Sequence, residues 1–150
     1  MPFEVSGMEA TIKMFHEKAA HTDRALTHAV RAGGKLLAEK LKEKAPVDTG
    51  ALRDSIKPDR VKYNAGDGYH CEVKPTGNHP KTGELLAKIG NILEYGRSSS
   101  AKNRKYQSAK AAKRTFNMAA RGWFHPIVKE NERAVLETMR DDFHAEMNKG

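Results

Sequence analysis

The sequence predicts an α+β fold, in which a long N-terminal helix and a C-terminal helix pack on a small antiparallel β-sheet, with a long basic insertion. Three observations carry this prediction. A helical apolar stripe occupies the first third of the chain, period-two alternation flanks a turn-rich stretch in the middle, and an apolar helical face returns at the end. At 150 residues the chain is expected to form one domain, residues 1–150, with the insertion at about 97–121.

Composition narrows the class of protein. The hydrophobic fraction is 38% and the charged fraction 31%, which indicates a modest core and favours an assembly subunit over an enzyme with a deep pocket. Cys71 is the only cysteine, so an intramolecular disulfide and a multi-cysteine zinc site are excluded. No apolar run approaches the roughly 20 residues that cross a bilayer, and Met1–Glu4 lacks signal-peptide character. We expect a soluble protein made in a reducing cytosol.

The N-terminal region is expected to begin with a short helix. Ser6, Gly7, Met8 and Glu9 have the form of a capping box, in which a hydroxyl and a Glu three residues later satisfy free amides. The helix should run to about residue 20, with two apolar side chains toward the core, Ile12 and Phe15.

A second helix is expected to reach about Lys44, capped by Thr22 or Asp23. Its apolar residues recur at steps of four, three, four and four, at Leu26, Val30, Gly33, Leu37 and Leu41. Two adjacent glycines, 33 and 34, lower helix propensity by roughly 1 kcal/mol each relative to alanine. Close approach of another backbone is the simplest reason for them.

The stretch KAPVDTGALRDSIK, residues 44–57, should join this helix to the sheet. Proline lacks an amide donor and restricts the residue before it, so it ends the helix. Asp or Thr can then cap a brief turn, Gly tolerates its φ, and two apolar residues return to the core. The residues of this junction are Pro46, Asp48, Thr49, Gly50, Leu52 and Ile56.

The middle of the chain predicts a hairpin and a third helix. Apolar positions alternate with polar ones on both sides of the turn 64–68, at Val61, Tyr63, Tyr69, Cys71 and Val73. Further on, Leu85, Ile89 and Ile92 or Leu93 indicate a short helix, although residues 92–95 also suit a strand.

The basic segment, residues 97–121, contains eight Lys or Arg and no acidic residue. The chain has 27 basic and 19 acidic residues, so removing these eight leaves 19 against 19, and the whole net charge of +8 lies here. The segment is rich in Ala and Lys and is helix-capable, and as one helix it would reach about 37 Å. Its basic residues are Arg97, Lys102, Arg104, Lys105, Lys110, Lys113, Arg114 and Arg121.

A compact aromatic cluster, Trp123 to Pro126, precedes the last helix, with the proline suited to the first turn. The apolar residues of that helix are expected to form its buried face, at Val128, Val135, Leu136, Met139, Phe143 and Met147.

No set of residues predicts catalysis. Asp48-Thr49-Gly50 has the form of an aspartic-protease triplet, and a homodimer would supply the second carboxylate, but the triplet follows a helix and a structural turn explains it better. The seven histidines form no recognisable ligand set, and phosphate-loop, nucleophile-elbow and dinucleotide fingerprints are absent from the sequence. We expect no catalytic residue, cofactor or metal ion.

Residues 44–56 nevertheless resemble a known signature. Lys44 to Ile56 is similar to the "APVDTGxLRxSI" motif of small neck or tail-component proteins of long-tailed bacteriophages and prophages of the lambdoid type. Two later pieces agree in order: Ile92 to Gly96 resembles the family's "vEfGT" element, and Trp123 to Pro126 its "PFlrPA" entry into the last helix. These pieces add Glu94, Gly96, Phe124 and Pro126 to the structural motif.

The resemblance implies a non-enzymatic virion protein of the head-tail junction, made in the host cytoplasm and built as a ring around the DNA channel. Its implied partners are copies of itself, head-completion or connector proteins, and the tail terminator or tail tube. Two departures stand out. Arg97 replaces the usual Thr after the motif glycine, and the span from Gly96 to Trp123 is longer than the family's connection.

The role of the basic segment therefore has to be argued from its charge. It can touch the phosphates of packaged double-stranded DNA, or it can clasp an acidic face of an adjoining ring. Eight phosphate contacts would bind tightly at low salt and hinder DNA exit, which favours the clasp. The alternative function is a nonspecific nucleic-acid-binding protein acting through residues 97–121, where Tyr106 and Phe116 interleave the charges.

Overall fold

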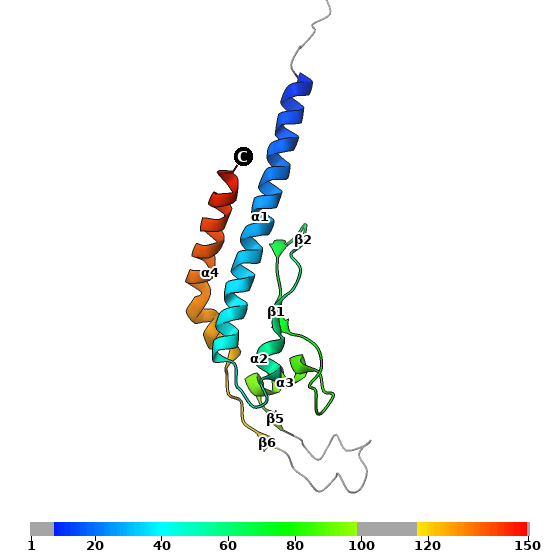
Figure 1. Ribbon diagram of the computed structural model, residues 1–150, viewed down its shortest axis with the longest axis vertical. Coiled ribbons are helices and arrows are strands. Elements are labelled where there is room, and N and C mark those ends of the chain that lie inside the picture. Colours follow the sequence, from blue (N-terminus) through cyan, green and yellow to red (C-terminus); the bar gives the residue numbers. More distant parts are fainter. Residues whose placement is uncertain (1–7, 99–116, 150) are drawn as a thin grey trace, which may run out of the picture.

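The computed structural model describes residues 8–98 and 117–149 (Figure 1). The elements are α1 (Met8–Lys44), α2 (Ala51–Ser55), β1 (Ile56–Pro58), β2 (Lys62–Asn64), β3 (Gly68–His70), β4 (Val73–Pro75), α3 (Leu86–Tyr95), β5 (Arg97–Ser98), β6 (Asn117–Met118) and α4 (Phe124–Met147). The α+β prediction is confirmed: the chain combines a long N-terminal helix and a C-terminal helix with short antiparallel strands, of which β1, β3 and β4 lie beside α1 (Figure 1).

The first helix is continuous, so the predicted break near residue 22 is wrong. Thr22 donates its hydroxyl hydrogen bond to the carbonyl oxygen of Lys18, at 2.9 Å, and Thr27 does the same to Asp23, at 2.8 Å. A hydroxyl satisfied on the preceding turn lets the helix continue, whereas a cap would have turned the chain. Ser6 and Gly7 of the predicted capping box lie outside the described residues.

Helix α1 packs along α4, and Figure 1 shows the two side by side. The contact is tightest at Gly33, where an added Cβ would lie 2.5 Å from Cγ of Met139. At Gly34 an added Cβ would lie 3.0 Å from Sγ of Cys71. The two glycines thus leave room for two side chains, Met139 on one side of α1 and Cys71 on another. The predicted close approach is real, but side chains make it, not a second backbone.

In the part of the chain that the structure describes, the expected small sheet is instead three separate two-stranded ladders. The predicted hairpin is β2–β3, in which Tyr63 pairs with Tyr69 and the turn is closed by a hydrogen bond from the Gly66 amide to Oδ1 of Asn64, at 3.2 Å. The alternation predicted through residue 73 does not form one strand. Val73 belongs instead to β4, which pairs with β1.

The buried core lies at one end of the molecule. It contains parts of α1, α2, β1, α3 and α4, through Ala38, Leu41, Ala45, Leu52, Ile56, Leu86, Trp123 and Ile127. Residues 92–95 are helical, so the strand alternative is wrong. Leu136 was predicted on the buried face of α4 but is 57% exposed. Most of the described core therefore surrounds the junction between α1 and the strands.

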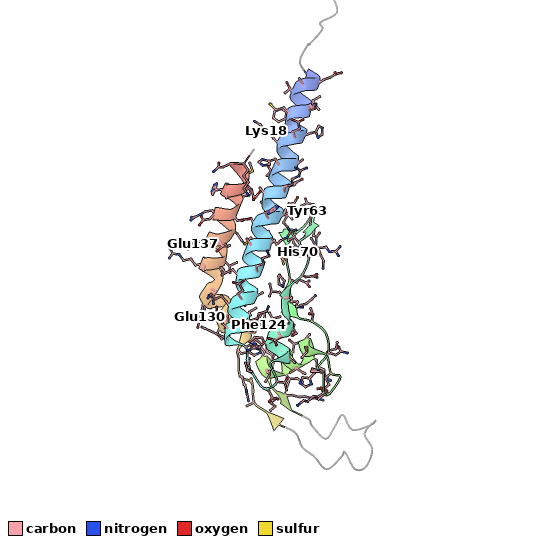
Figure 2. The ribbon with its side chains drawn as sticks, in the orientation of Figure 1. Lys18, Tyr63, His70, Phe124, Glu130 and Glu137 are labelled. Atoms are coloured by element: carbon pink, nitrogen blue, oxygen red, sulfur yellow. The ribbon has the colours of Figure 1, made fainter. Side chains whose placement is uncertain are left out.

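The other end of the molecule is different. Helix α1 extends beyond the C-terminal end of α4 (Figure 1), and Figure 2 shows Lys18 on this projecting part. Residues 9–20 are all exposed. Ile12 and Phe15, predicted toward the core, are 49% and 63% exposed. Those two predictions are wrong because α4 is too short to cover this part of the stripe.

Candidate functional site

The turn between α1 and α2 is built around a glycine. Gly50 has φ +79°, the left-handed region that a side chain disfavours, and its carbonyl accepts a hydrogen bond from the amide of Asp54 at 3.0 Å. The amide of Ala51 makes a long hydrogen bond, 3.4 Å, to Oγ1 of Thr49. The N-cap of α2 is Gly50 and carries no side-chain cap hydrogen bond, so the prediction that Asp48 or Thr49 caps this helix is wrong; Thr49 contacts the Ala51 amide from one residue earlier, and Asp48 stays exposed.

A second loop, residues 79–84, contacts this turn through His79. Sequence patterns did not single out this residue. Nε2 of His79 lies 3.2 Å from Oγ1 of Thr49. Its Nδ1 accepts hydrogen bonds from the amides of Lys81 and Thr82, at 3.2 and 3.3 Å. This pattern fits the tautomer with the proton on Nε2, which then donates to Thr49. The imidazole thus fixes the loop 79–84 against the α1–α2 turn.

Glu94 caps α4 from a different helix. Its carboxylate, on a residue only 8% exposed, accepts hydrogen bonds from the amides of Phe124 at 2.6 Å and His125 at 3.2 Å, and lies 2.6 Å from Nδ1 of His125. Burial raises the pKa of this carboxyl, but the hydrogen bonds from Phe124 and His125 outweigh it, so the pKa lies below its ordinary value. A buried carboxylate at a helix N-terminus is stabilised by the free amides and the helix dipole.

Gly96 brings two backbones together directly after this cap. Its φ is +76° and ψ 176°, a region almost reserved for glycine, and an added Cβ would lie 2.6 Å from the carbonyl oxygen of Met118. The amide of Arg121 donates to the carbonyl of Leu93 at 2.8 Å, and Nε1 of Trp123 to that of Gly90 at 3.3 Å. Residues 118–123 are thereby tied to the end of α3.

The three pieces singled out by the sequence therefore meet at one place, which we call the joint: residues 41–56, 86–96 and 118–127. Leu52 and Ile56 share a core with Trp123 and Ile127. Pro126 stands in the first turn of α4, as predicted. No local pattern connects Glu94 with Phe124, because the partners are thirty residues apart and the cap forms only after folding.

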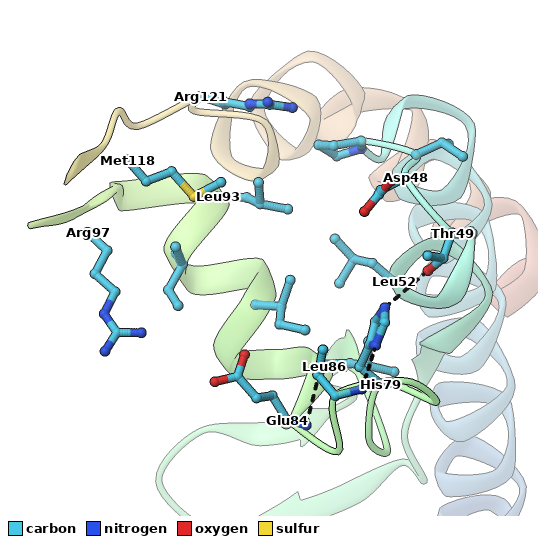
Figure 3. Close-up of a pocket in the computed structure, with 16 residues that line it drawn as sticks. Asp48, Thr49, Leu52, His79, Glu84, Leu86, Leu93, Arg97, Met118 and Arg121 are labelled. Carbon is cyan, nitrogen blue, oxygen red and sulfur yellow. Dashed lines mark hydrogen bonds between the residues drawn. The ribbon is translucent and has the colours of Figure 1, made fainter. Parts of the chain in front are cut away.

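One face of the joint is hollowed (Figure 3). The hollow measures about 610 Å³, and its apolar lining includes Val47, Leu52, Leu86, Ile89, Ile92, Leu93 and Met118. Charged and polar side chains complete it, among them Arg97 with Asp48 across from it, and also Glu84 and Arg121. An apolar floor with a few charges at the rim suits an apolar side chain of a partner.

The basic segment starts and ends beside this hollow. Strands β5 and β6 pair antiparallel, Arg97 with Met118 and Ser98 with Asn117. A single helix over the whole segment is therefore wrong at both ends, because the ends are strands. Six of its eight cations lie outside the described residues, namely Lys102, Arg104, Lys105, Lys110, Lys113 and Arg114, as do Tyr106 and Phe116.

Within residues 8–98 and 117–149, no cluster of three or more His, Cys, Asp or Glu side chains is arranged to hold a metal ion. In the same part of the chain, none of the helices combines the length and the apolar character needed to cross a membrane.

Comparison with known proteins adds one match. Residues 9–96 match the sequence profile of the HK97-gp10-like family, described as "Bacteriophage HK97-gp10, putative tail-component". The match covers α1, the turn, the strands β1–β4 and α3, and ends at Gly96. No curated protein and no solved structure is similar enough to the chain to count as a match.

Proposed function

The chain belongs to the HK97-gp10-like family of phage tail components, and on this premise we propose that it joins head to tail in the phage neck. In this proposal it is a structural virion protein, a tail-completion protein, head-tail connector or tail terminator. Copies form a ring around the DNA channel, between the head-completion proteins and the tail tube. The protein assembles in the host cytoplasm and remains at the head-tail junction of the virion.

The joint is the observation that carries this proposal. The side chains of the joint bind one another: the Glu94 carboxylate caps α4, Thr49 contacts His79, and Leu52 lies in the core. Such residues hold the helices and strands of the joint in fixed positions relative to one another. The family and this geometry together favour a mechanical role over an enzymatic one.

In this role the basic segment clasps an acidic face of the adjoining ring, with DNA contact as the alternative. Arg97 and Arg121 stand at its base, beside the apolar hollow. An acidic face on the adjoining ring would neutralise these cations. A lining of eight cations facing DNA would instead bind phosphate in a steeply salt-dependent way and oppose DNA exit.

A replacement designed on the β5–β6 pairing tests both roles. Ser98 and Asn117 are opposite each other, so residues 99–116 can be exchanged for Asn-Gly, which closes a two-residue hairpin. The exchange removes six of the eight cations and lowers the net charge from +8 to +2. We expect phage carrying it to release heads and tails that fail to join, counted by electron microscopy, while the protein stays folded.

The rival function makes the opposite prediction. A nonspecific nucleic-acid-binding protein would bind duplex DNA with a steep salt dependence, lose that binding in the exchanged variant, and still yield joined particles. Deletion of the whole gene is the control for the proposed role. Joined, infectious particles without the protein would contradict a head-tail joining function outright.

A further inference from the structure

We propose that the projecting end of α1 in one copy docks into the hollow of a second copy of this chain. The inference rests on the proposed function, because a ring requires contacts between copies. It goes further by assigning the two surfaces. We call residues 9–20 of α1 the tip.

The tip carries an apolar stripe without a cover in the described chain. Ile12, Phe15 and Ala19 follow each other at steps of three and four, and the same stripe continues into Leu26 and Val30, which are half-buried. Helix α4 packs on the later part and ends at Met147, below the tip (Figure 1). An amphipathic helix is normally stabilised by packing of its apolar face, so the tip is suited to a partner.

The hollow has the opposite shape and lies at the opposite end of the molecule. Figure 1 shows α2, α3 and β5–β6 at one end of the long axis and the start of α1 at the other. One chain cannot bring its own tip to its own hollow, but two chains can. A contact between different surfaces of identical chains is heterologous, the type from which closed rings are built.

Two charges on the tip can pair with two of the charges that line the hollow. At 100° per residue, Glu9 and Lys18 lie on opposite flanks of the stripe formed by Ile12, Phe15 and Ala19. The charged residues that line the hollow are Asp48, Glu84, Arg97 and Arg121, with Arg97 on one side and Asp48 across from it (Figure 3). A helix laid into the hollow with Phe15 down brings Glu9 toward the arginine and Lys18 toward the aspartate. The reverse orientation would bring Glu9 toward Asp48 and Lys18 toward Arg97, and repulsion within each pair disfavours it.

A photocrosslinking experiment tests the assignment directly. Benzoylphenylalanine replaces Phe15 in the full-length protein, which is irradiated both purified and within assembled particles. Peptide mapping is expected to find links to residues 46–52, 86–93 or 118–121. Because tip and hollow lie at opposite ends of one chain, any such link joins two copies. The matched control places the same group at Leu136, which is 57% exposed on α4, and no link to the hollow is expected there.

Charge exchange provides a second, independent readout. Phe15→Asp is expected to weaken self-association in sedimentation experiments about tenfold or more, the scale of losing one buried aromatic anchor. Lys18→Asp and Asp48→Lys should each weaken it, and the two together should restore it. Circular dichroism checks that every variant remains folded.

The outcomes separate the two proposals. Links from position 15 to another virion protein, or none in either preparation, would overturn the docking. So would Phe15→Asp protein that supports normal numbers of tailed particles, although the head-tail role would stand. Tailed particles from a gene deletion would overturn the proposed function itself.

Discussion

The joint and the tip are built from the same kind of residues but use them differently. At the joint, Leu41 and Ile56 are fully buried and a carboxylate from one helix caps another. At the tip, Phe15 is 63% exposed on an equally regular helix. The difference shows that packing within one chain buries the apolar side chains at the joint but leaves those at the tip exposed. The apolar stripe of α1 is longer than the fold of one chain requires.

The largest effect on the free energy of unfolding should come from removing a buried side chain at the joint. Leu41→Ala removes a side chain with 0% exposure and is expected to lower the free energy of unfolding by about 4 kcal/mol. Urea denaturation measures it. Leu136→Ala, at a 57% exposed position, is the matched control and should change stability by less than about 0.5 kcal/mol. Equal losses of stability in Leu41→Ala and Leu136→Ala would contradict the assignment of Leu41 to the core and Leu136 to the surface.

Gly96→Ala comes next. The new Cβ would meet the Met118 carbonyl oxygen at 2.6 Å with φ at +76°, and neither backbone can yield without breaking the ties to α3. We expect a loss of about 3 kcal/mol in the same assay. Gly66→Ala, with nothing within 4 Å of the added Cβ, is the control and should cost far less.

Glu94→Gln sharpens the comparison through its pH dependence. We expect a loss of about 2 kcal/mol at pH 7, because the charged hydrogen-bond acceptor is removed from a buried cap. The folded-state pKa of Glu94 lies below the ordinary 4.5, so its stabilisation is complete above that value and disappears as the pH falls through the lower one. The free energies of unfolding of the two proteins should therefore converge as the pH is lowered from 7 to below 4.5.

The smallest effect on folding is expected at the tip. Phe15→Ser should change the free energy of unfolding of the monomer by less than about 0.5 kcal/mol, since the ring is largely exposed already. Measurement at low protein concentration isolates the monomer. A loss comparable to that of Leu41→Ala would mean that the tip is covered within its own chain, and the comparison would fail.

Much of this architecture follows from local pattern. The β2–β3 hairpin, the Gly50 turn and Pro46 at the helix end depend on neighbours in the sequence, and the patterns predicted them. The break in α1 was predicted wrongly. Threonine is a residue type that often caps helices, but Thr22 donates its hydroxyl hydrogen bond to Lys18 on the preceding turn of the same helix. Local pattern cannot tell these two uses of a hydroxyl apart.

The rest depended on contacts distant in sequence. Exposure of Ile12 and Phe15 is decided by where α4 ends, far along the chain. The role of Glu94 depends on amides thirty residues later, and only the family resemblance singled it out. His79 was missed because its partner, Thr49, comes from another loop. For the joint, then, sequence patterns identified the segments that meet, but the hydrogen bonds between those segments could only be seen in the folded structure.

The β5–β6 pairing also makes the basic segment a replaceable cassette. Its two ends leave the fold side by side, and the backbone ties at Leu93 and Gly96 hold the body behind them. Once such a stem exists, doubling the length of what it carries costs only about 0.6 kcal/mol in loop entropy. The length between Ser98 and Asn117 can therefore change without redesigning the domain, and an experimenter can insert an affinity tag there.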